Sequence, residues 1–420
     1  MPDSTDADTL HEEAGSLQRP DYGGGTIANI PATTAALLGA PFDGLPPLRE
    51  AAWQPLADGV KRVVVLVVDA MGWNLVQRVL DEQSWVWTRA LARERVSSVF
   101  PSTTVAALTS MWTGTAPAQH GLIAFHLFLP EFAVLGQMIH FTPVFAHWPG
   151  GLVQAGLEPE SFLPVPGTAE QLAQAGIPTY SFKPYQIVDS HLSKIHGRGV
   201  AETLPIVTAA DLCVRIRALL EEKAGQRLYA HAYWPAVDSL SHMHGWDAEP
   251  VAAEVRSLFQ VVEQELWQPL SAAAREGTAL FITADHGQTL TPAAQAISLT
   301  DHPELQAMLL MRPAGEPRTP YFYARQGQQA QIVAYLRDKL GHAMTVWPAA
   351  EALAAGLFGP PPYAPDVALR LGDVVATMHA GYILLTADEE EDRSVNFRAR
   401  HGGMTRAEME APWLGYRLDT

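Results

Sequence analysis

Three short, mainly apolar runs, each followed by an acidic residue, form the clearest pattern in the chain. The runs and the residues after them are Val63 to Val68 with Asp69, Arg227 to Trp234 with Asp238, and Thr278 to Thr283 with Asp285 and His286. Apolar runs of this length are typical of strands buried on both faces of a parallel sheet. Open α/β sheets bind ligands at the carboxyl ends of their strands, so these polar residues are candidates for one site.

Helical periodicity separates the predicted strands, most clearly in Ala209 to Lys223 and Val251 to Glu265. Alternating strands and helices predict a layered α/β/α fold with a largely parallel central sheet. We interpret residues 1–45, which are polar and then rich in Gly and Pro, as an N-terminal arm. Residues 46–420 form one domain with insertions at about 125–205 and 297–385.

Composition and charge narrow the classes of partner. The 420 residues are 48% hydrophobic and 17% charged, as expected of an ordered globular protein. The net charge of -17 gives no attraction to a nucleic-acid polymer or an anionic membrane, so we expect neither as a partner. A small anion stays compatible with this charge, because bound divalent cations reverse the local field.

The location is predicted from targeting signals and cysteine content. The first residues lack a basic segment followed by an apolar one, and no apolar run reaches membrane-spanning length. Cys213 is the only cysteine, so an internal disulfide is excluded. We therefore expect a cytoplasmic protein.

The segment from Phe100 to Gly121 contains a candidate nucleophile at a predicted helix start. Pro101 and Ser102 favour a helix start, and Gly114 favours its end. Thr103 and Thr104 would lie in the first turn, where free N–H groups and the helix dipole favour an anion. Either threonine could also be only a cap.

Two Asp/His groups have spacings that suit metal binding. Asp238 and His242 are four residues apart, so a helix presents both on one face. Asp285 and His286 can reach one ion only if the chain turns after the strand, which Gly287 would permit. Mixed Asp and His ligands suit zinc or a similar ion. Taken alone, Asp238 and His242 could also be unrelated polar residues on an exposed helix, and an Asp at a strand end could also be only a helix cap.

The order of these motifs resembles the alkaline phosphatase superfamily, and within it the type I phosphodiesterase/nucleotide pyrophosphatase branch. The resemblance runs from about residue 60 to 415. It rests on Asp69, Pro101-x-x-Thr104 with Thr113-Gly114, His120-Gly121, Asp238-x-x-x-His242, Asp285-His286-Gly287 and His401-Gly402-Gly403.

The resemblance implies an alkaline phosphatase-like domain with two divalent metal ions, foremost zinc, with manganese or mixed occupancy left open. It implies that Thr104 lies between the ions, contacts them and attacks phosphorus to give a phospho-threonine intermediate. His120 is implied to be structural. The implied ligand sets are Asp238, His242 and His401 for one ion, and Asp69, Asp285 and His286 for the other.

The substrate pocket departs from the branch at Phe125, where the resemblance implies an Asn that donates to a phosphoryl oxygen. His126 or a residue of an insertion would have to supply that hydrogen bond. No Lys or Arg occurs between Thr104 and Lys183, which favours a monoanionic diester over a dianionic monoester. A cation could still come from Lys183, Lys194 or Arg198.

We therefore expect a metal-dependent phosphoester hydrolase of the phosphodiesterase/nucleotide pyrophosphatase type, acting on small phosphoesters that include nucleotide-like ones. Within enzymes, the alternatives are a phosphomonoesterase and a phosphonate hydrolase or phosphotransferase. Outside enzymes, the alternative is an inactive metal-binding interaction module, which the presence of Thr104 beside six ligands argues against. The physiological substrate and the oligomeric state stay open.

Overall fold

The apolar run before Asp69 forms the centre of a sheet in the computed structural model, which describes residues 17–146 and 148–420. This strand, β1 (Arg62–Val68), is buried along its whole length. It pairs in parallel with β8 (Leu228–Trp234) and with β9 (Thr278–Thr283). The three strands predicted from apolar runs are therefore neighbours, in the order β9-β1-β8.

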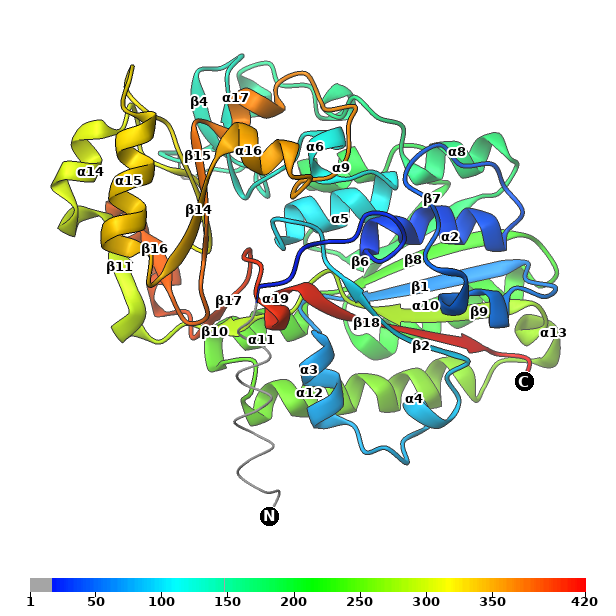
Figure 1. Ribbon diagram of the computed structural model, residues 1–420. Helices are drawn as coiled ribbons and strands as arrows, with labels where there is room; N and C mark the ends of the chain where they lie inside the picture. The colour runs from blue at the N-terminus through cyan, green and yellow to red at the C-terminus, as the bar shows by residue number, and fades with distance from the viewer. Residues whose placement is uncertain (1–16, 147) are drawn as a thin grey trace.

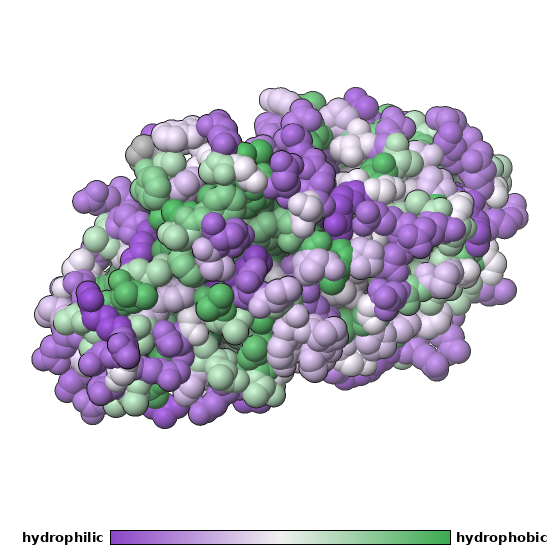
Figure 2. Space-filling view, turned by 90° about the horizontal axis from the view of Figure 1, so that it is seen from above, coloured by the Kyte–Doolittle hydropathy of each residue, from purple (hydrophilic) through white to green (hydrophobic). Residues whose placement is uncertain are grey.

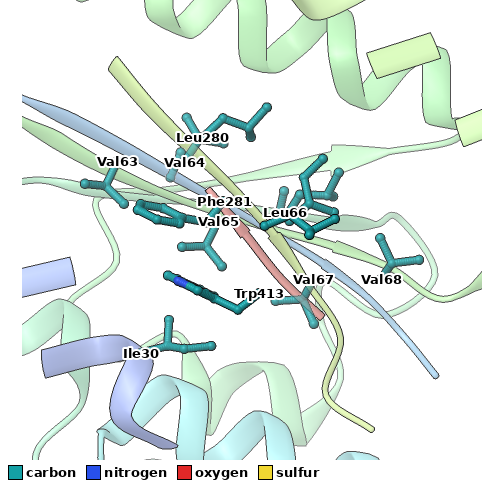
Figure 3. Close-up of a cluster of buried hydrophobic side chains, with 14 of the residues drawn as sticks. Ile30, Val63, Val64, Val65, Leu66, Val67, Val68, Leu280, Phe281 and Trp413 are labelled. Carbon is teal, nitrogen blue, oxygen red and sulfur yellow. The ribbon is translucent and has the colours of Figure 1, made fainter. Parts of the chain in front are cut away.

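The complete central sheet has seven strands in the order β2-β18-β9-β1-β8-β6-β7. The outer strands are β2 (Ala92–Ser97), β6 (Thr179–Pro184), β7 (Glu202–Ile206) and β18 (Glu410–Arg417). β18 runs antiparallel to β9, and its Trp413 stacks on Phe281 with ring centroids 4.4 Å apart. Figure 3 shows this pair beside the valines of β1 and Ile30. The prediction of a layered, largely parallel α/β fold is confirmed.

Helices cover both faces of this sheet (Figure 1). One face carries α2 (Ile30–Leu37), α5 (Thr104–Thr113) and α8 (Thr168–Gln174). The opposite face carries α3 (Trp73–Val79), α10 (Ala209–Glu222) and α12 (Glu249–Val261), which continues as a π-helical turn, η5 (Val262–Trp267). Both helices predicted from periodicity are thus present as α10 and as α12 with η5.

The two predicted insertions contribute to a single second sheet, with the order β14-β15-β13-β12-β3-β4-β5. Gly315 of β12 pairs with His126 of β3, which joins the two insertions. The strands are β3 (His126–Leu129), β4 (Val134–Gln137), β5 (Thr142–Pro143), β12 (Ala314–Glu316), β13 (Thr319–Phe322), β14 (Met344–Pro348) and β15 (Val374–Met378).

The first insertion is shorter than the predicted range of about 125–205, because β6 and β7 belong to the central sheet. β7 lies at the edge of the sheet, and four of its five residues are exposed or half-buried, whereas β6 lies between β7 and β8 and is almost fully buried. An edge strand such as β7 needs no continuous apolar run, and in β6 the buried Thr179, Ser181 and Lys183 interrupt the run, so the hydrophobic pattern reveals neither strand.

The predicted arm also differs from the structure. Residues 1–16 lie outside the described part of the chain, but Ile27 and Ile30 are fully buried in the main core. Pro31 near the start of α2 and the glycines before it break the helical period, which conceals this packing in the sequence. No helix in the described residues is long and apolar enough to cross a membrane.

Candidate active site

Three neighbouring strands deliver the acidic residues to one edge of the central sheet. Asp69 directly follows β1, and Asp285 lies two residues beyond the end of β9. Asp238 follows β8 within α11 (Ala236–His244). Because β9, β1 and β8 are adjacent and parallel, their carboxyl ends meet, and the three carboxylates converge.

One group of possible ligands consists of Asp238, His242 and His401, whose ligand atoms lie within 4.8 Å of one another. The turn of α11 places His242 Nε2 3.3 Å from Asp238 Oδ1. His401 Nε2 approaches the same oxygen at 3.7 Å. His401 comes from the loop after β17 (Ala399–Arg400), which pairs with β10 (Thr289–Leu290).

The second group consists of Asp69, Asp285 and His286, all of them buried. His286 Nε2 lies 3.5 Å from Asp69 Oδ1 and 3.4 Å from Asp285 Oδ2. Gly287 is needed here for space, because a Cβ at this position would lie 2.1 Å from the backbone oxygen of Ala407. The expected turn therefore depends on close backbone packing.

Each of the three histidines is oriented by a backbone carbonyl. Since a carbonyl only accepts, the ring Nδ1 carries the hydrogen, and the lone pair of Nε2, on the side of the carboxylates, is left to bind a cation. The pairs are His242 with Ala399 at 2.8 Å, His401 with Ser102 at 3.1 Å and His286 with Gly287 at 3.1 Å.

The buried carboxylates lack the partners that their charge requires. Asp69 Oδ1 and Asp285 Oδ2 make no hydrogen bond among the described residues. Burial raises the pKa of Asp69 well above its usual value, and the nearby Asp285 and Asp238 raise it further. Burial likewise raises the pKa of Asp285. Unpaired carboxylates of this kind fit cation ligands, so the group of Asp69, Asp285 and His286 suits a divalent metal ion, while the first group suits one through its mixed Asp and His ligand atoms.

Two further residues orient the carboxylates and were not found from the sequence. The Tyr233 hydroxyl donates to Asp69 Oδ2. Gln288 Nε2 donates to Asp238 Oδ1 at 2.6 Å. The position of Gln288 directly after Asp285-His286-Gly287 was a usable signal, whereas Tyr233 is recognisable only once its strand is paired with β1.

Thr104, and not Thr103, is the threonine directed at these groups. Thr103 is the N-cap of α5 with extended backbone, and Thr104 is the first helical residue. Thr104 Oγ1 lies 3.1 Å from His286 Nε2. The helix ends at Gly114, with φ of 68°, as its position in the sequence predicts.

The landmark His120 lies away from both groups. It is buried, its Nε2 lies 3.0 Å from Ser110 Oγ, and its Nδ1 accepts from the N–H of Leu122. These bonds fit the structural role that the resemblance implied. Phe125 and His126, by contrast, line a cavity together with Thr104.

Thr104 lies where two cavities meet. One of about 740 Å³ extends past Trp112, Lys183 and His231. The other, of about 710 Å³, extends past Phe125, His126, Glu316 and Arg400. Both are also lined by Asp238 and Ile139. Figure 2 shows apolar residues gathered over the part of the molecule that holds the second sheet, and hydrophilic residues along most of the outline of the molecule.

Known structures share this fold over most of the chain. Murine ectonucleotide pyrophosphatase/phosphodiesterase 5 is 18% identical, with a TM-score of 0.61, covering 84% of this chain and 87% of that one. An inactive variant of the murine protein, in complex with AMP, is 17% identical with a TM-score of 0.59, covering 85% of this chain and 88% of that one. Phosphonoacetate hydrolase from Sinorhizobium meliloti, in complex with phosphonoacetate, is 17% identical with a TM-score of 0.60, covering 84% of this chain and 89% of that one.

The sequence itself identifies the family. A search among curated proteins found no match. Residues 63–404, however, match the type I phosphodiesterase/nucleotide pyrophosphatase family, whose members are metal-dependent phosphoester hydrolases, typically with two metal ions. This match covers most of the chain and confirms the resemblance to the alkaline phosphatase superfamily. The chain belongs to the type I phosphodiesterase/nucleotide pyrophosphatase family.

Proposed function

We propose that this protein hydrolyses small phosphodiesters, nucleotide-like ones included, through a phospho-threonine intermediate on Thr104. The observation that carries the proposal is the position of the Thr104 hydroxyl. It lies 3.1 Å from His286 Nε2 and lines both cavities. A hydroxyl directed into a cluster of metal ligands at a helix start has the surroundings that an activated nucleophile needs.

Two divalent ions, foremost zinc, fit the two Asp/His groups. Asp238, His242 and His401 would hold one ion, and Asp69, Asp285 and His286 the other, with Thr104 beside them. When bound, such ions lower the energy of a developing alkoxide and neutralise phosphoryl charge. Manganese and mixed occupancy are the alternatives that metal analysis distinguishes.

The residues of the chain divide the reaction into two steps. Thr104 Oγ1 forms a bond to phosphorus, loses its proton, and the bond from phosphorus to the leaving oxygen breaks. Water then attacks the same phosphorus, so the bond to Thr104 Oγ1 breaks and the hydroxyl regains a proton. The free N–H groups in the first turn of α5 face the negative charge that builds up in both steps.

The cavities favour a diester over a monoester. A diester carries two substituents on phosphorus, and the two cavities that meet at Thr104 offer space for one each. Among the described lining residues, the first cavity contains one Lys or Arg, Lys183, and the second contains one, Arg400. Neither offers the paired cations that a monoester dianion usually recruits.

The ligands of the structural neighbours support a small substrate for this site. AMP is bound by the murine phosphodiesterase variant, and phosphonoacetate by the bacterial hydrolase. Both are small molecules with one phosphorus centre. We therefore propose a small phosphoester as the partner of this site, with phosphomonoester and phosphonate hydrolysis as the competing activities.

The test compares bis(4-nitrophenyl) phosphate with 4-nitrophenyl phosphate after metal removal and add-back. We expect faster turnover of the diester, and no turnover with chelator. Thr104→Ala should lose at least roughly 10³-fold in rate while keeping its metals. Thr104→Ser is the matched control, because it retains a hydroxyl and should retain part of the activity.

Two results would contradict the proposal. Faster turnover of the monoester would exclude the diester preference. Undiminished activity of Thr104→Ala would exclude the nucleophile, and Thr103→Ala would then be the next variant to measure.

We also propose a cytoplasmic location. Buried Cys213 is the only cysteine, which fits a reducing compartment. Fractionation of cells that make the natural protein tests this, and recovery outside the cytoplasm would contradict it.

A further inference from the structure

A buried lysine lies in the wall of the first cavity, on a different strand from the acidic ligands. Lys183, near the end of β6, is 6% exposed and lines this cavity with Thr104. Phe182 pairs with Ala232 of β8, so the next residues along the two parallel strands, Lys183 and Tyr233, lie beside each other. Only β8 separates β6 from β1, which places Lys183 about 10 Å across the sheet from the strand that carries Asp69.

No counter-ion to the Lys183 ammonium lies among residues 17–146 and 148–420. Within the described residues the lysine makes no hydrogen bond and no ion pair, and its Nζ lies 5.6 Å from the centre of the Trp112 ring. Of the acidic residues that line the cavity, Asp69 and Asp238 belong to the ligand groups. The third, Asp189, is exposed to solvent and forms no ion pair with the lysine.

Two uncharged histidines complete this wall. Burial, and next the nearby Lys183, lower the pKa of His231 to about 3. Burial also lowers the pKa of His196 well below its usual value. Trp112 lies against both rings, with centroids 4.3 Å from His231 and 6.2 Å from His196. His231 Nε2 is buried without a hydrogen-bond partner among the described residues, so the wall contains a second polar atom whose hydrogen bond is unmade there.

Other buried cations of the chain show what a purely structural role looks like. The Arg318 guanidinium binds both carboxylate oxygens of Glu408 and several backbone carbonyls. The Arg62 guanidinium donates to Thr278 and to backbone carbonyls. Lys183 is nearly as enclosed, but among the described residues it has no partner of this kind. A buried charge without a partner is costly, and the cavity in front of it can hold the missing anion.

We propose that Lys183, with Trp112 and His231 beside it, binds a second anionic group on the substrate, a carboxylate or a phosphate carried by one substituent of the phosphoester. The inference rests on the proposed function, because Thr104 fixes where the reacting phosphorus lies. It narrows the substrate class to phosphoesters in which one substituent carries its own negative charge. An anion at Lys183 gains a charge-assisted hydrogen bond at a buried ammonium.

The test uses ω-phosphonoalkanoic acids of increasing chain length as inhibitors of bis(4-nitrophenyl) phosphate hydrolysis. Each acid is compared with its carboxamide, which has nearly the same shape without the charge. At the best length we expect the acid to bind at least about 10-fold more tightly than the amide. Lys183→Met should reduce this ratio to near one, and Lys183→Arg should retain most of it. Lys194→Met is the matched control, since Lys194 is exposed on α9 (His191–His196) and should not change the ratio.

The two sources of negative charge are separated by α,ω-bisphosphonates of the same lengths. Tighter binding of the bisphosphonate assigns a phosphate, and tighter binding of the carboxylic acid assigns a carboxylate. Equal binding of acid and amide at every length in the wild type would overturn the inference, as would an unchanged ratio in Lys183→Met. If the proposed function is wrong, no diester is hydrolysed. Calorimetry on the metal-loaded protein would still measure the ratio of acid binding to amide binding, so the two failures are distinguishable.

Discussion

Replacing Lys183 by Met should make the protein more stable near neutral pH. The lysine is buried without a counter-ion in the part of the chain that the structure describes, and burial lowers its pKa from 10.5 to about 8. Each tenfold change in proton affinity corresponds to about 1.4 kcal/mol, so holding the ammonium inside the fold costs about 3 kcal/mol. The Trp112 face offsets about 1 kcal/mol of this cost, which leaves an expected gain of about 2 kcal/mol for Lys183→Met.

The stability difference between Lys183→Met and the wild type should depend on pH. Below about pH 8 the lysine is protonated in both the folded and the unfolded state, so the full cost is present. Between about pH 8 and the ordinary value of 10.5 the unfolded chain binds more protons, and the free energy of unfolding of the wild type rises with pH. The advantage of Lys183→Met should therefore shrink over this range and disappear above it.

Urea denaturation of both proteins with chelator present, at neutral and at alkaline pH, measures this difference without charge from bound metal. Taking the difference between the two proteins cancels the titration of the groups that do not interact with Lys183. A variant that is less stable than the wild type near neutral pH, or an advantage that stays constant up to about pH 10.5, would refute the reasoning.

Three further outcomes follow from the site and the core. Asp285→Asn should lower the bound metal from about two ions per chain to about one, and metal analysis by mass spectrometry would reveal two ions if Asp285 is not a ligand. Tyr233→Phe removes the donor to Asp69, so metal affinity should fall roughly 10- to 100-fold in a chelator competition, and an unchanged affinity would exclude this orienting role. Arg318→Met leaves the Glu408 carboxylate buried without its ion pair, which should cost about 3–5 kcal/mol in urea unfolding. A cost below about 1 kcal/mol would show that the pair is replaceable.

The sequence predicts strands where burial makes a continuous pattern and misses them where it does not. β1 has all of its residues buried, and its run of valines predicts it directly. β7 lies at the edge of the sheet, where partly exposed residues interrupt the pattern, and buried polar residues interrupt it in β6, so the hydrophobic pattern places both strands in an insertion. The joining of two distant insertions into one sheet depends on long-range pairing, such as that of Gly315 with His126, and leaves no local signal.

The residues of the candidate site, too, are predictable where the sequence carries a local pattern and not where they depend on long-range pairing. Asp69, Asp238 and Asp285 could be found because strand ends in a parallel sheet converge. His401 comes near them only through the pairing of β17 with β10, so the residues alone did not single it out and the family resemblance did. Lys183 could only be named as one of several possible cations, because its lack of a counter-ion is a property of the folded core.

The stereochemistry at phosphorus tests the central claim most directly. A phosphorothioate diester of known configuration would be hydrolysed in water enriched in oxygen-18, and the configuration of the product determined. Two successive in-line displacements, first by Thr104 and then by water, each invert phosphorus, so the mechanism predicts overall retention. Overall inversion would show that water attacks the substrate directly, and the phospho-threonine intermediate would have to be abandoned.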